Sequence, residues 1–327
     1  MVLPHAVRET LVLFLRPQTR NLDGIMKRTI LFLLFLFFMI SAKAEISFST
    51  LSFPEDSTYI DLADTVITDF DSFEAFLDQF PHLSRVDMWK TSMTRDLCDR
   101  LASRYPAVRW GWTMVIKCKG GNHIIRTDDT SFSTLHNNKS PGHTAEELEI
   151  LKYCWDLKAL DIGHNKVDRL DWLSDFPDLR VLIVACNHIT DISPLAGLKK
   201  LEYSELFKNE IRDITPLRNL THLMDLNLSL NKIDDLSVLK KMPWLKRLWI
   251  YSCRYIHKEP PRKVVKDLQA ALPDTYIDYT HYSTGGRWRY LANGDPHPHY
   301  KVIQEIFGKD HQHPAHQYIP FEDSYPE

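Results

Sequence analysis

The sequence contains few cysteines and few glycines, and it has no excess of positive charge. Five cysteines, scattered between Cys98 and Cys253 in a chain of 327 residues, are too few and too widely spaced for a disulfide-stabilised scaffold. Eleven glycines, 44% hydrophobic residues and 25% charged residues exclude a collagen-like or wholly disordered chain. The formal net charge is −3, and residues 45–327 carry 34 basic against 41 acidic side chains. This balance argues against a nucleic-acid partner.

Motifs of the common catalytic centres are also missing. The chain has no Gly-x-Ser-x-Gly, no His-Glu-x-x-His and no glycine-rich phosphate loop. Histidines gather at residues 297–299 and 311–316, and imidazole groups bind transition metals. However, Pro298 and Pro314 interrupt any helix that would space these ligands regularly. We therefore predict no enzymatic activity, no cofactor and no metal site, with a metal-binding or enzymatic tail as the alternative.

Residues 26–44 have the pattern of a secretory signal peptide. A basic pair precedes the eleven-residue apolar run 30–40, and Ala-Lys-Ala follows shortly after it. The run is shorter than the roughly 20 residues that span a bilayer. We expect cleavage after Ala44 and a secreted product with no stable membrane insertion, and an uncleaved anchor is the alternative. Met26 is the predicted start, which makes residues 1–25 an upstream extension.

A 22-residue period organises the middle of the chain. Segments that begin at Leu157, Leu179, Leu201, Leu223 and Leu245 follow the pattern L-x-x-L-x-L-x-x-N/C. The apolar positions predict a short strand with one buried side, and the asparagine can satisfy backbone groups in the turn that follows. Stacked copies predict a buried ladder, formed by Asn165, Asn187, Asn209, Asn231 and Cys253.

The second half of each repeat predicts a short helical turn on the outer side. Ser193, Thr215 and Ser237 are suitable N-caps, and a proline follows the first two. Twenty-two residues leave room for little more than one 3₁₀ turn. Each unit must bury its apolar side against its neighbours, so stability comes from stacking and from terminal caps.

These repeats resemble the leucine-rich repeats of the 22-residue, internalin-like class found in secreted bacterial proteins. The resemblance implies an α/β fold, a right-handed solenoid with a single parallel sheet on its concave face and 3₁₀ or helical segments on its convex face. It also implies a non-enzymatic protein that acts by binding other macromolecules.

The flanking regions are predicted to be degenerate repeats and caps. Residues 45–156 contain two strand-like copies, near Ile60 and Val86, and a hairpin inserted around residues 112–127. The regular repeats occupy residues 157–256. Residues 257–280 form a C-terminal cap with an amphipathic helix, and residues 281–327 form a loosely ordered tail rich in His and Tyr, with a short helix near residues 300–307.

The solvent side of the strands is the candidate binding face. Its aromatic and charged side chains have the composition of an interface, which favours a protein partner, or a glycan. Two alternatives remain open: the tail folds back over these aromatics, or the protein assembles with itself as a structural envelope component. The candidate contact residues are Arg85, Asp87, Trp89, Asp161, Tyr203, Glu205, Phe207, Asp225, Asn227, Arg247, Trp249 and Tyr251.

Overall fold

The computed structural model describes residues 45–117, 122–134, 142–253, 259–281, 286–308 and 317–324. They belong to two compact units, one formed by the residues up to Thr58 with Asp71–His82, the other by Tyr59–Phe70 with Leu83 onward. The predicted signal peptide and upstream extension lie outside the described residues. Within the described part of the chain, the helices are too short or too polar to cross a membrane.

The first unit is a small aromatic-rich element. Strands β1 (Glu45–Phe48) and β2 (Leu51–Pro54) form an antiparallel hairpin, and α3 (Phe70–Leu77) supplies its apolar partner. The Phe48 ring lies 5.5 Å from the ring of Phe73 and 4.8 Å from that of Phe76, measured between centroids. These three rings give the hairpin a core of its own.

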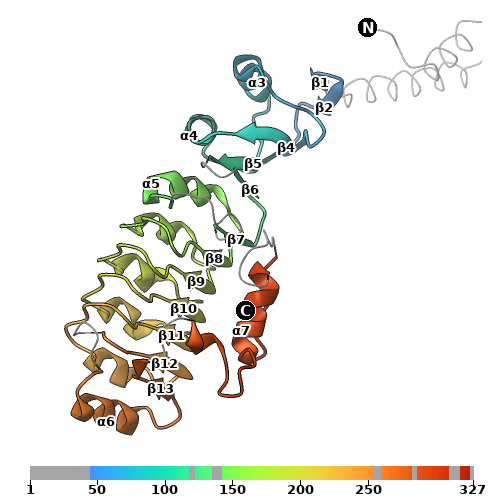
Figure 1. The fold of residues 1–327 in the computed structure, drawn as a ribbon. Helices are drawn as coiled ribbons and strands as arrows, with labels where there is room; N and C mark the ends of the chain where they lie inside the picture. Colours follow the sequence, from blue (N-terminus) through green and yellow to red (C-terminus); the bar gives the residue numbers. More distant parts are fainter. Residues whose placement is uncertain are drawn as a thin grey trace, which may run out of the picture. The chain divides into compact units, whose positions relative to one another are not determined.

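The second unit contains a solenoid built on a sheet of seven parallel strands (Figure 1). Its register follows the repeat, because Tyr203 pairs with Val181 on one side and with Asp225 on the other, each 22 residues away. The predicted leucine-rich-repeat solenoid is therefore confirmed. The strands run in chain order: β7 (Ser131–Ser133), β8 (Ala159–Asp161), β9 (Val181–Ile183), β10 (Tyr203–Glu205), β11 (Asp225–Asn227), β12 (Arg247–Trp249) and β13 (Tyr276–Asp278).

The structure places the asparagines in a buried column. The Asn187 Nδ2 donates to the carbonyl of Val184 in its own turn and to that of Ile162 in the preceding turn, at 3.1 and 2.9 Å. Its Oδ1 accepts from the backbone N–H of Val167 at 2.9 Å. Each amide thus satisfies backbone groups of two adjacent coils. Asn165, Asn209 and Asn231 make equivalent bonds, and the Cys253 Sγ lies 3.1 Å from the Leu228 carbonyl.

The residue before each ladder position has a left-handed backbone. Its φ lies between 52° and 59°, a region that non-glycine residues seldom adopt. At this turn the N–H of Cys186 donates to the Phe207 carbonyl at 2.8 Å, so the strained turns are bonded from coil to coil. The five residues share no chemistry, which is why the sequence pattern did not reveal them: His164, Cys186, Lys208, Leu230 and Ser252.

Short 3₁₀ helices form the outer side of the repeats, as predicted, but their capping differs from the prediction. Ser193 lies inside its 3₁₀ turn, and its backbone N–H donates to Asp191 Oδ1 at 2.8 Å. Asp213 and Asp235 accept from Thr215 and Ser237 in the same way. In each repeat the acceptor is therefore the aspartate two positions before the predicted cap. Its carboxylate accepts from the backbone N–H two residues later and so closes an Asx turn. The helices are η2 (Asp171–Asp175), η3 (Ser193–Gly197), η4 (Thr215–Asn219) and η5 (Ser237–Lys241).

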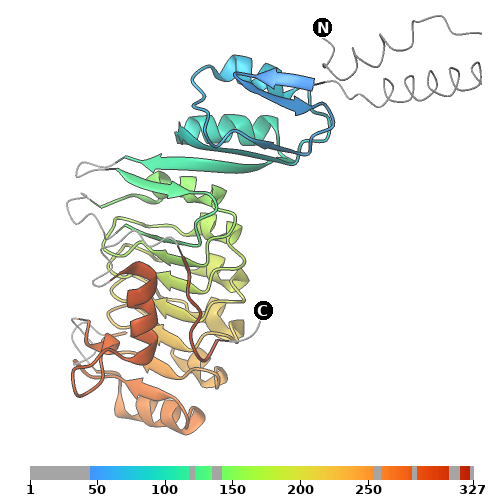
Figure 2. The ribbon, with the colours of Figure 1, turned by 90° about the vertical axis from the view of Figure 1, so that its right-hand side faces the viewer.

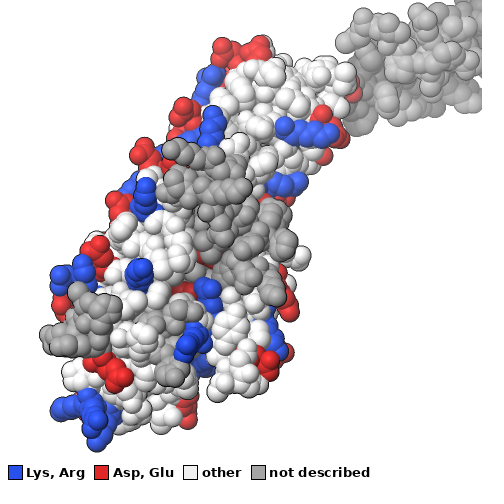
Figure 3. All heavy atoms as spheres, viewed as in Figure 1, with Lys and Arg blue, Asp and Glu red and all other residues white. Residues whose placement is uncertain are grey.

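Charges of both signs alternate on the surface. Figure 3 shows Lys and Arg interleaved with Asp and Glu over the described residues in view, without a broad field of one sign. Lys232 pairs with Glu210 at 2.6 Å, and Lys200 pairs with Asp178 at 2.7 Å, each across neighbouring repeats. Exposed pairs of this kind contribute little to stability and keep the surface well solvated.

The N-terminal coils carry a second sheet. β3 (Tyr59–Asp61), β4 (Arg85–Met93) and β5 (Arg109–Ile116) are parallel, and β6 (His123–Arg126) returns antiparallel to β5. Thr91 Oγ1 accepts from the N–H of Ile67 at 2.8 Å and so replaces the ladder asparagine in this coil. The other elements here are α4 (Arg95–Arg104), α5 (Ala145–Leu148), whose Thr144–Glu147 capping box is formed, and η1 (Glu149–Tyr153).

The C-terminal residues form a packed layer instead of the loosely ordered tail predicted from composition. After α6 (Arg262–Ala271) and β13, the chain forms η7 (Arg287–Arg289) and α7 (Pro298–Phe307). Figures 1 and 2 both show α7 lying against the strands of the solenoid. We refer to residues 286–308 and 317–324 as the C-terminal cover. Six of its large apolar residues are buried against the repeats, which fixes the segment in place: Trp288, Tyr300, Ile303, Ile306, Phe307 and Phe321.

Candidate binding face

Most of the predicted concave binding face is buried beneath the C-terminal cover. Tyr203 is only 2% exposed and Trp249 only 3%, and Phe207 and Tyr251 are also buried. The prediction that these aromatics face solvent is therefore wrong, and the tail folds back over them. The physical reason is the apolar spacing of α7, which matches an amphipathic helix. One buried apolar cluster joins the repeats to the cover. The repeats contribute Ala159, Val181, Ile183, Ala185, Tyr203, Phe207, Met224 and Trp249. The cover contributes Trp288, Tyr300, Ile303, Ile306, Phe307 and Phe321.

Glu205 anchors the first part of the cover. Its carboxylate accepts from Arg289 Nε at 3.1 Å and Nη2 at 2.7 Å, and from the Tyr203 hydroxyl at 2.5 Å. Burial alone would raise the pKa of Glu205, but the Arg289 guanidinium and the Tyr203 hydroxyl outweigh burial, so the pKa lies below its ordinary value. Glu205 is thus predicted to stay ionised and to hold η7 on the strands.

Asp225 anchors the start of α7. Its Oδ2 accepts from Arg247 Nε at 2.9 Å and lies 2.9 Å from His299 Nδ1. Burial favours the neutral acid, yet the His299 hydrogen bond and the Arg247 charge lower the pKa of Asp225 overall. The predicted contact residues Asp225 and Arg247 therefore form a buried ion pair that binds the chain's own helix.

A third set of polar contacts holds the end of the cover. Glu202 accepts from Arg180 at 2.8 Å, from the Tyr318 hydroxyl at 3.0 Å and from Ser324 Oγ at 3.1 Å. Lys246 pairs with Asp323 at 2.5 Å. Because the contacts extend from Arg180, just before β9, to Arg247 on β12, the cover is fixed along the sheet rather than at one point.

The remaining predicted contact residues of the regular repeats have structural roles. The Oδ1 of Asp161 accepts from the N–H of Gly163, and that of Asn227 from the N–H of Ser229, each at 3.0 Å. These are local turn bonds within a buried layer. The Tyr251 ring packs at 5.4 Å against the edge of His281.

Arginines and aromatic rings remain at least partly exposed in the N-terminal coils, whose strands β3–β6 form a sheet separate from the seven-stranded one. Arg85 and Arg109 both stack on the Trp155 ring, with guanidinium carbons 5.7 and 5.0 Å from its centroid. Tyr59 is 46% exposed and Trp155 36%. We name this set the arginine–aromatic cluster; it consists of Tyr59, Arg85, Trp89, Arg109, Arg126 and Trp155.

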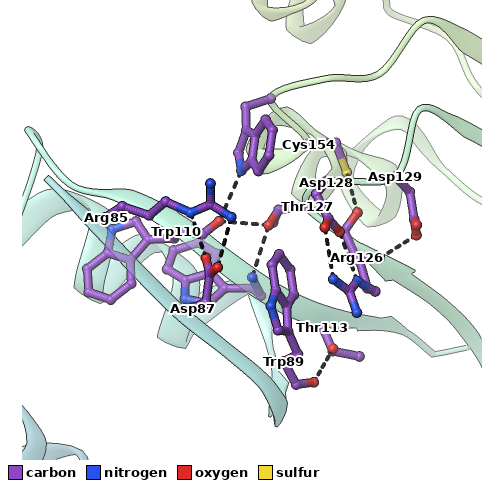
Figure 4. Close-up of polar contacts among 12 residues, drawn as sticks. Arg85, Asp87, Trp89, Trp110, Thr113, Arg126, Thr127, Asp128, Asp129 and Cys154 are labelled. Carbon is purple, nitrogen blue, oxygen red and sulfur yellow. Dashed lines mark hydrogen bonds and ion pairs between the residues drawn. The ribbon is translucent and has the colours of Figure 1, made fainter. Parts of the chain in front are cut away.

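Acidic partners fix the orientation of two arginines in the cluster (Figure 4). Arg85 donates to both carboxylate oxygens of the buried Asp87, at 3.0 and 2.8 Å. Arg126 donates to both oxygens of Asp128, at 2.8 Å each, while its guanidinium carbon lies 3.9 Å from the Trp89 ring centroid. These bidentate contacts restrict the arginine rotamers before any partner arrives.

Gly111 on β5 has no side chain, and the Trp89 ring of the neighbouring strand β4 packs into the space this leaves. A Cβ at this position would be 2.6 Å from the Trp89 ring and 2.3 Å from Asp87 Oδ1. Four cluster members, Tyr59, Arg109, Arg126 and Trp155, were not predicted from the sequence. Tyr59 and Arg109 occupy the same register position as Arg85, so the strand alignment held the missing signal.

Two family models match segments of the regular repeats. A model of two leucine-rich repeats matches residues 155–197, and a model of one leucine-rich repeat matches residues 219–240. The chain contains leucine-rich repeats in these two segments.

Among solved structures, the leucine-rich-repeat chain is similar to two internalins from Listeria monocytogenes. Internalin C2 is 23% identical, with a TM-score of 0.32 over 45% of this chain and 69% of that chain. A second internalin, inlF, is 15% identical, with a TM-score of 0.34 over 65% of this chain and 68% of that chain. A comparison with curated protein sequences gives no match.

Part of the histidine-rich segment can be placed in the structure. His299 is buried, and its two ring nitrogens lie 2.9 Å from Asp225 and 3.5 Å from Asp323. Residues 311–316 lie outside the described residues. Among the residues that are described, the structure brings no three His, Cys, Asp or Glu side chains into a metal-binding arrangement.

Proposed function

We propose that this leucine-rich-repeat protein is a secreted, non-enzymatic protein that binds another protein through the arginine–aromatic cluster. The observation that carries the proposal is the exposed Trp155 ring of the N-terminal coils, which two guanidinium groups contact. Trp, Tyr and Arg are the residue types that dominate binding energy at protein interfaces.

The geometry favours binding because the cluster is ordered in advance. Asp87 fixes the orientation of Arg85, and Asp128 fixes that of Arg126. Gly111 leaves the space on β5 against which the Trp89 ring packs. Less conformational entropy is then lost when a partner binds.

Charge indicates the chemistry of the partner. The exposed Arg109 makes no ion pair with a carboxylate in the described ranges, although its guanidinium stacks on Trp155. A partner that presents Asp or Glu beside an apolar residue would pair with Arg109 and cover the indole. We therefore propose an acidic protein surface as the partner.

Photo-cross-linking tests this assignment. With a photoreactive residue in place of Tyr59, we expect discrete adducts with one protein from the native host, and we expect R109E to reduce their yield at least tenfold. A photoreactive residue at Lys232, which is exposed on a different surface, is the matched control and is expected to give no such adduct. Equal yields from both positions, or no effect of R109E, would contradict the proposal; adducts with the chain itself would favour the self-assembling alternative.

Secretion has its own test. If cleavage follows Ala44, the mature protein begins at Glu45, which is the first residue of β1. We expect N-terminal sequencing of protein recovered from outside the cells to read Glu-Ile-Ser-Phe. Recovery in the membrane fraction with residues 26–44 still attached would support an uncleaved anchor instead.

A further inference from the structure

A groove of about 940 Å³ lies at the other end of the concave face, away from the arginine–aromatic cluster. One wall comes from β12 and β13, through Trp249, Tyr276 and Asp278, and the other from the cover, through Tyr290, Leu291 and His297. A hollow of this volume is in the range that holds small organic ligands. The groove exists only because the cover packs on the sheet, so it is a product of the self-covering found above.

Part of the groove lining is apolar and exposed. Tyr276 is 60% exposed, and Tyr290 and Leu291 are also exposed. Seven large apolar side chains are exposed in the described part of the chain, and three of them line this one groove. Exposed apolar residues gathered in a concavity indicate a binding site rather than ordinary surface scatter.

The charges around the groove largely compensate each other. Arg247 is neutralised by Asp225, and Lys246 is paired with Asp323 at 2.5 Å. The other two charged residues of the lining, Arg287 and Asp278, are of opposite sign. These opposite charges leave little net field to attract a strongly charged ligand, whereas Arg109, at the opposite end, has no carboxylate partner among the residues that the structure describes. A neutral ligand is therefore favoured.

The polar groups on the groove can both donate and accept hydrogen bonds. Burial lowers the pKa of His297 to about 4, so its ring is neutral at pH 7. Its Nδ1 accepts from the N–H of His299 at 3.1 Å, which places the ring proton on Nε2 as a donor. Asp278 Oδ1 accepts from Thr280, and its Oδ2 supplies an acceptor.

We propose that this groove binds a neutral oligosaccharide. A pyranose ring has apolar C–H faces that stack on aromatic planes such as Tyr276 and Tyr290, and hydroxyl groups that both donate and accept. The rim formed by His297 and Asp278 matches those hydroxyl groups. An extended protein segment would bury the same aromatic residues, but it would not explain why the charges around the groove compensate each other. A protein segment is therefore the alternative occupant that the test must distinguish from a saccharide.

Binding to an array of immobilised oligosaccharides tests the proposal directly. The purified full chain is applied to neutral glucose-, galactose- and N-acetylglucosamine-based oligosaccharides, with sialylated oligosaccharides on the same array. We expect the parent protein to be retained on at least one neutral class of oligosaccharide. We expect the double variant Tyr276→Ala with Tyr290→Ala to bind that class at least tenfold more weakly. Ile124→Ala, which removes an exposed apolar side chain on β6 outside the groove and outside the arginine–aromatic cluster, is the matched control and should bind like the parent.

Each other outcome overturns the assignment. Retention on none of the neutral classes, retention only on sialylated members, or equal retention of the double variant would each contradict a neutral-saccharide site. Capture of a protein that is lost with the double variant but kept with Ile124→Ala would assign the groove to a protein segment. Unfolding in urea shows whether the double variant is folded, and if it is not, His297→Ala replaces it. The array result is independent of the cross-linking at Tyr59.

Discussion

Replacing Phe307 by alanine should reduce the free energy of unfolding by about 3–5 kcal/mol. Phe307 is fully buried in the cluster that joins α7 to the concave face, so its removal leaves a cavity and deletes apolar contacts on both sides. Urea unfolding followed by circular dichroism measures the change. Leu291→Ala in the same cover is the matched control, because Leu291 is exposed and its loss should change stability by less than about 0.5 kcal/mol.

Acid should weaken the same contact. Glu205 and Asp225 have pKa values below their ordinary values of 4.5 and 3.8 in the folded protein. A lowered folded pKa contributes stability that is present above the unfolded value and is lost as the pH falls through the folded value. We expect stability to decrease below about pH 4.5, and Glu205→Gln to flatten that dependence.

If Phe307→Ala and Leu291→Ala had equal small effects, the cover would not be part of the folded structure.

The second large effect is expected at the asparagine ladder. Asn209 Nδ2 donates to the carbonyls of Val184 and Leu206 at 3.0 and 3.1 Å, and its Oδ1 accepts from Ile189 N–H at 3.1 Å. Asn209→Ala leaves these buried backbone groups without their partner, and each such group costs about 1–3 kcal/mol. We expect a total loss of roughly 3–5 kcal/mol in urea unfolding.

A surface asparagine provides the comparison for this variant. Asn219 lies at the end of η4 and is exposed, so Asn219→Ala should leave the unfolding midpoint nearly unchanged. Because stability in a repeat array depends on contacts between neighbours, the Asn209 variant should also broaden the transition. A loss below about 1 kcal/mol would show that the ladder is not a main source of stability.

The regular coils could be predicted from the sequence because their determinants are local and repeated. Leu201 and Asn209 each serve one position of a unit that recurs every 22 residues, so the strand, the ladder and the outer turn follow from one pattern. The capping residues were placed wrongly, since Ser193 and Asp191 are both good acceptors and only the local backbone geometry chooses between them.

From the sequence, packing of the C-terminal residues on the repeats could be stated only as an alternative. The contact between the cover and the strands joins residues far apart in the chain. Ile303 and Phe307 show helical spacing, but nothing in the sequence states which surface that helix would bury. The surrounding His, Pro and Tyr also suggested a solvated tail. The arginine–aromatic cluster was found only in part for a similar reason, since Trp155 joins it from outside the strands and β5 lacks the leucine pattern.

Hydroxyl-radical footprinting of the unmodified protein, read residue by residue by mass spectrometry, tests the central claim most directly. The structure predicts fast oxidation of Tyr59, Trp155 and Tyr276 and strong protection of Tyr203, Phe207 and Trp249. Oxidation of Tyr203 and Trp249 as fast as that of Trp155 would show that the concave face is open in solution, and it would contradict an account in which the protein covers its own repeats.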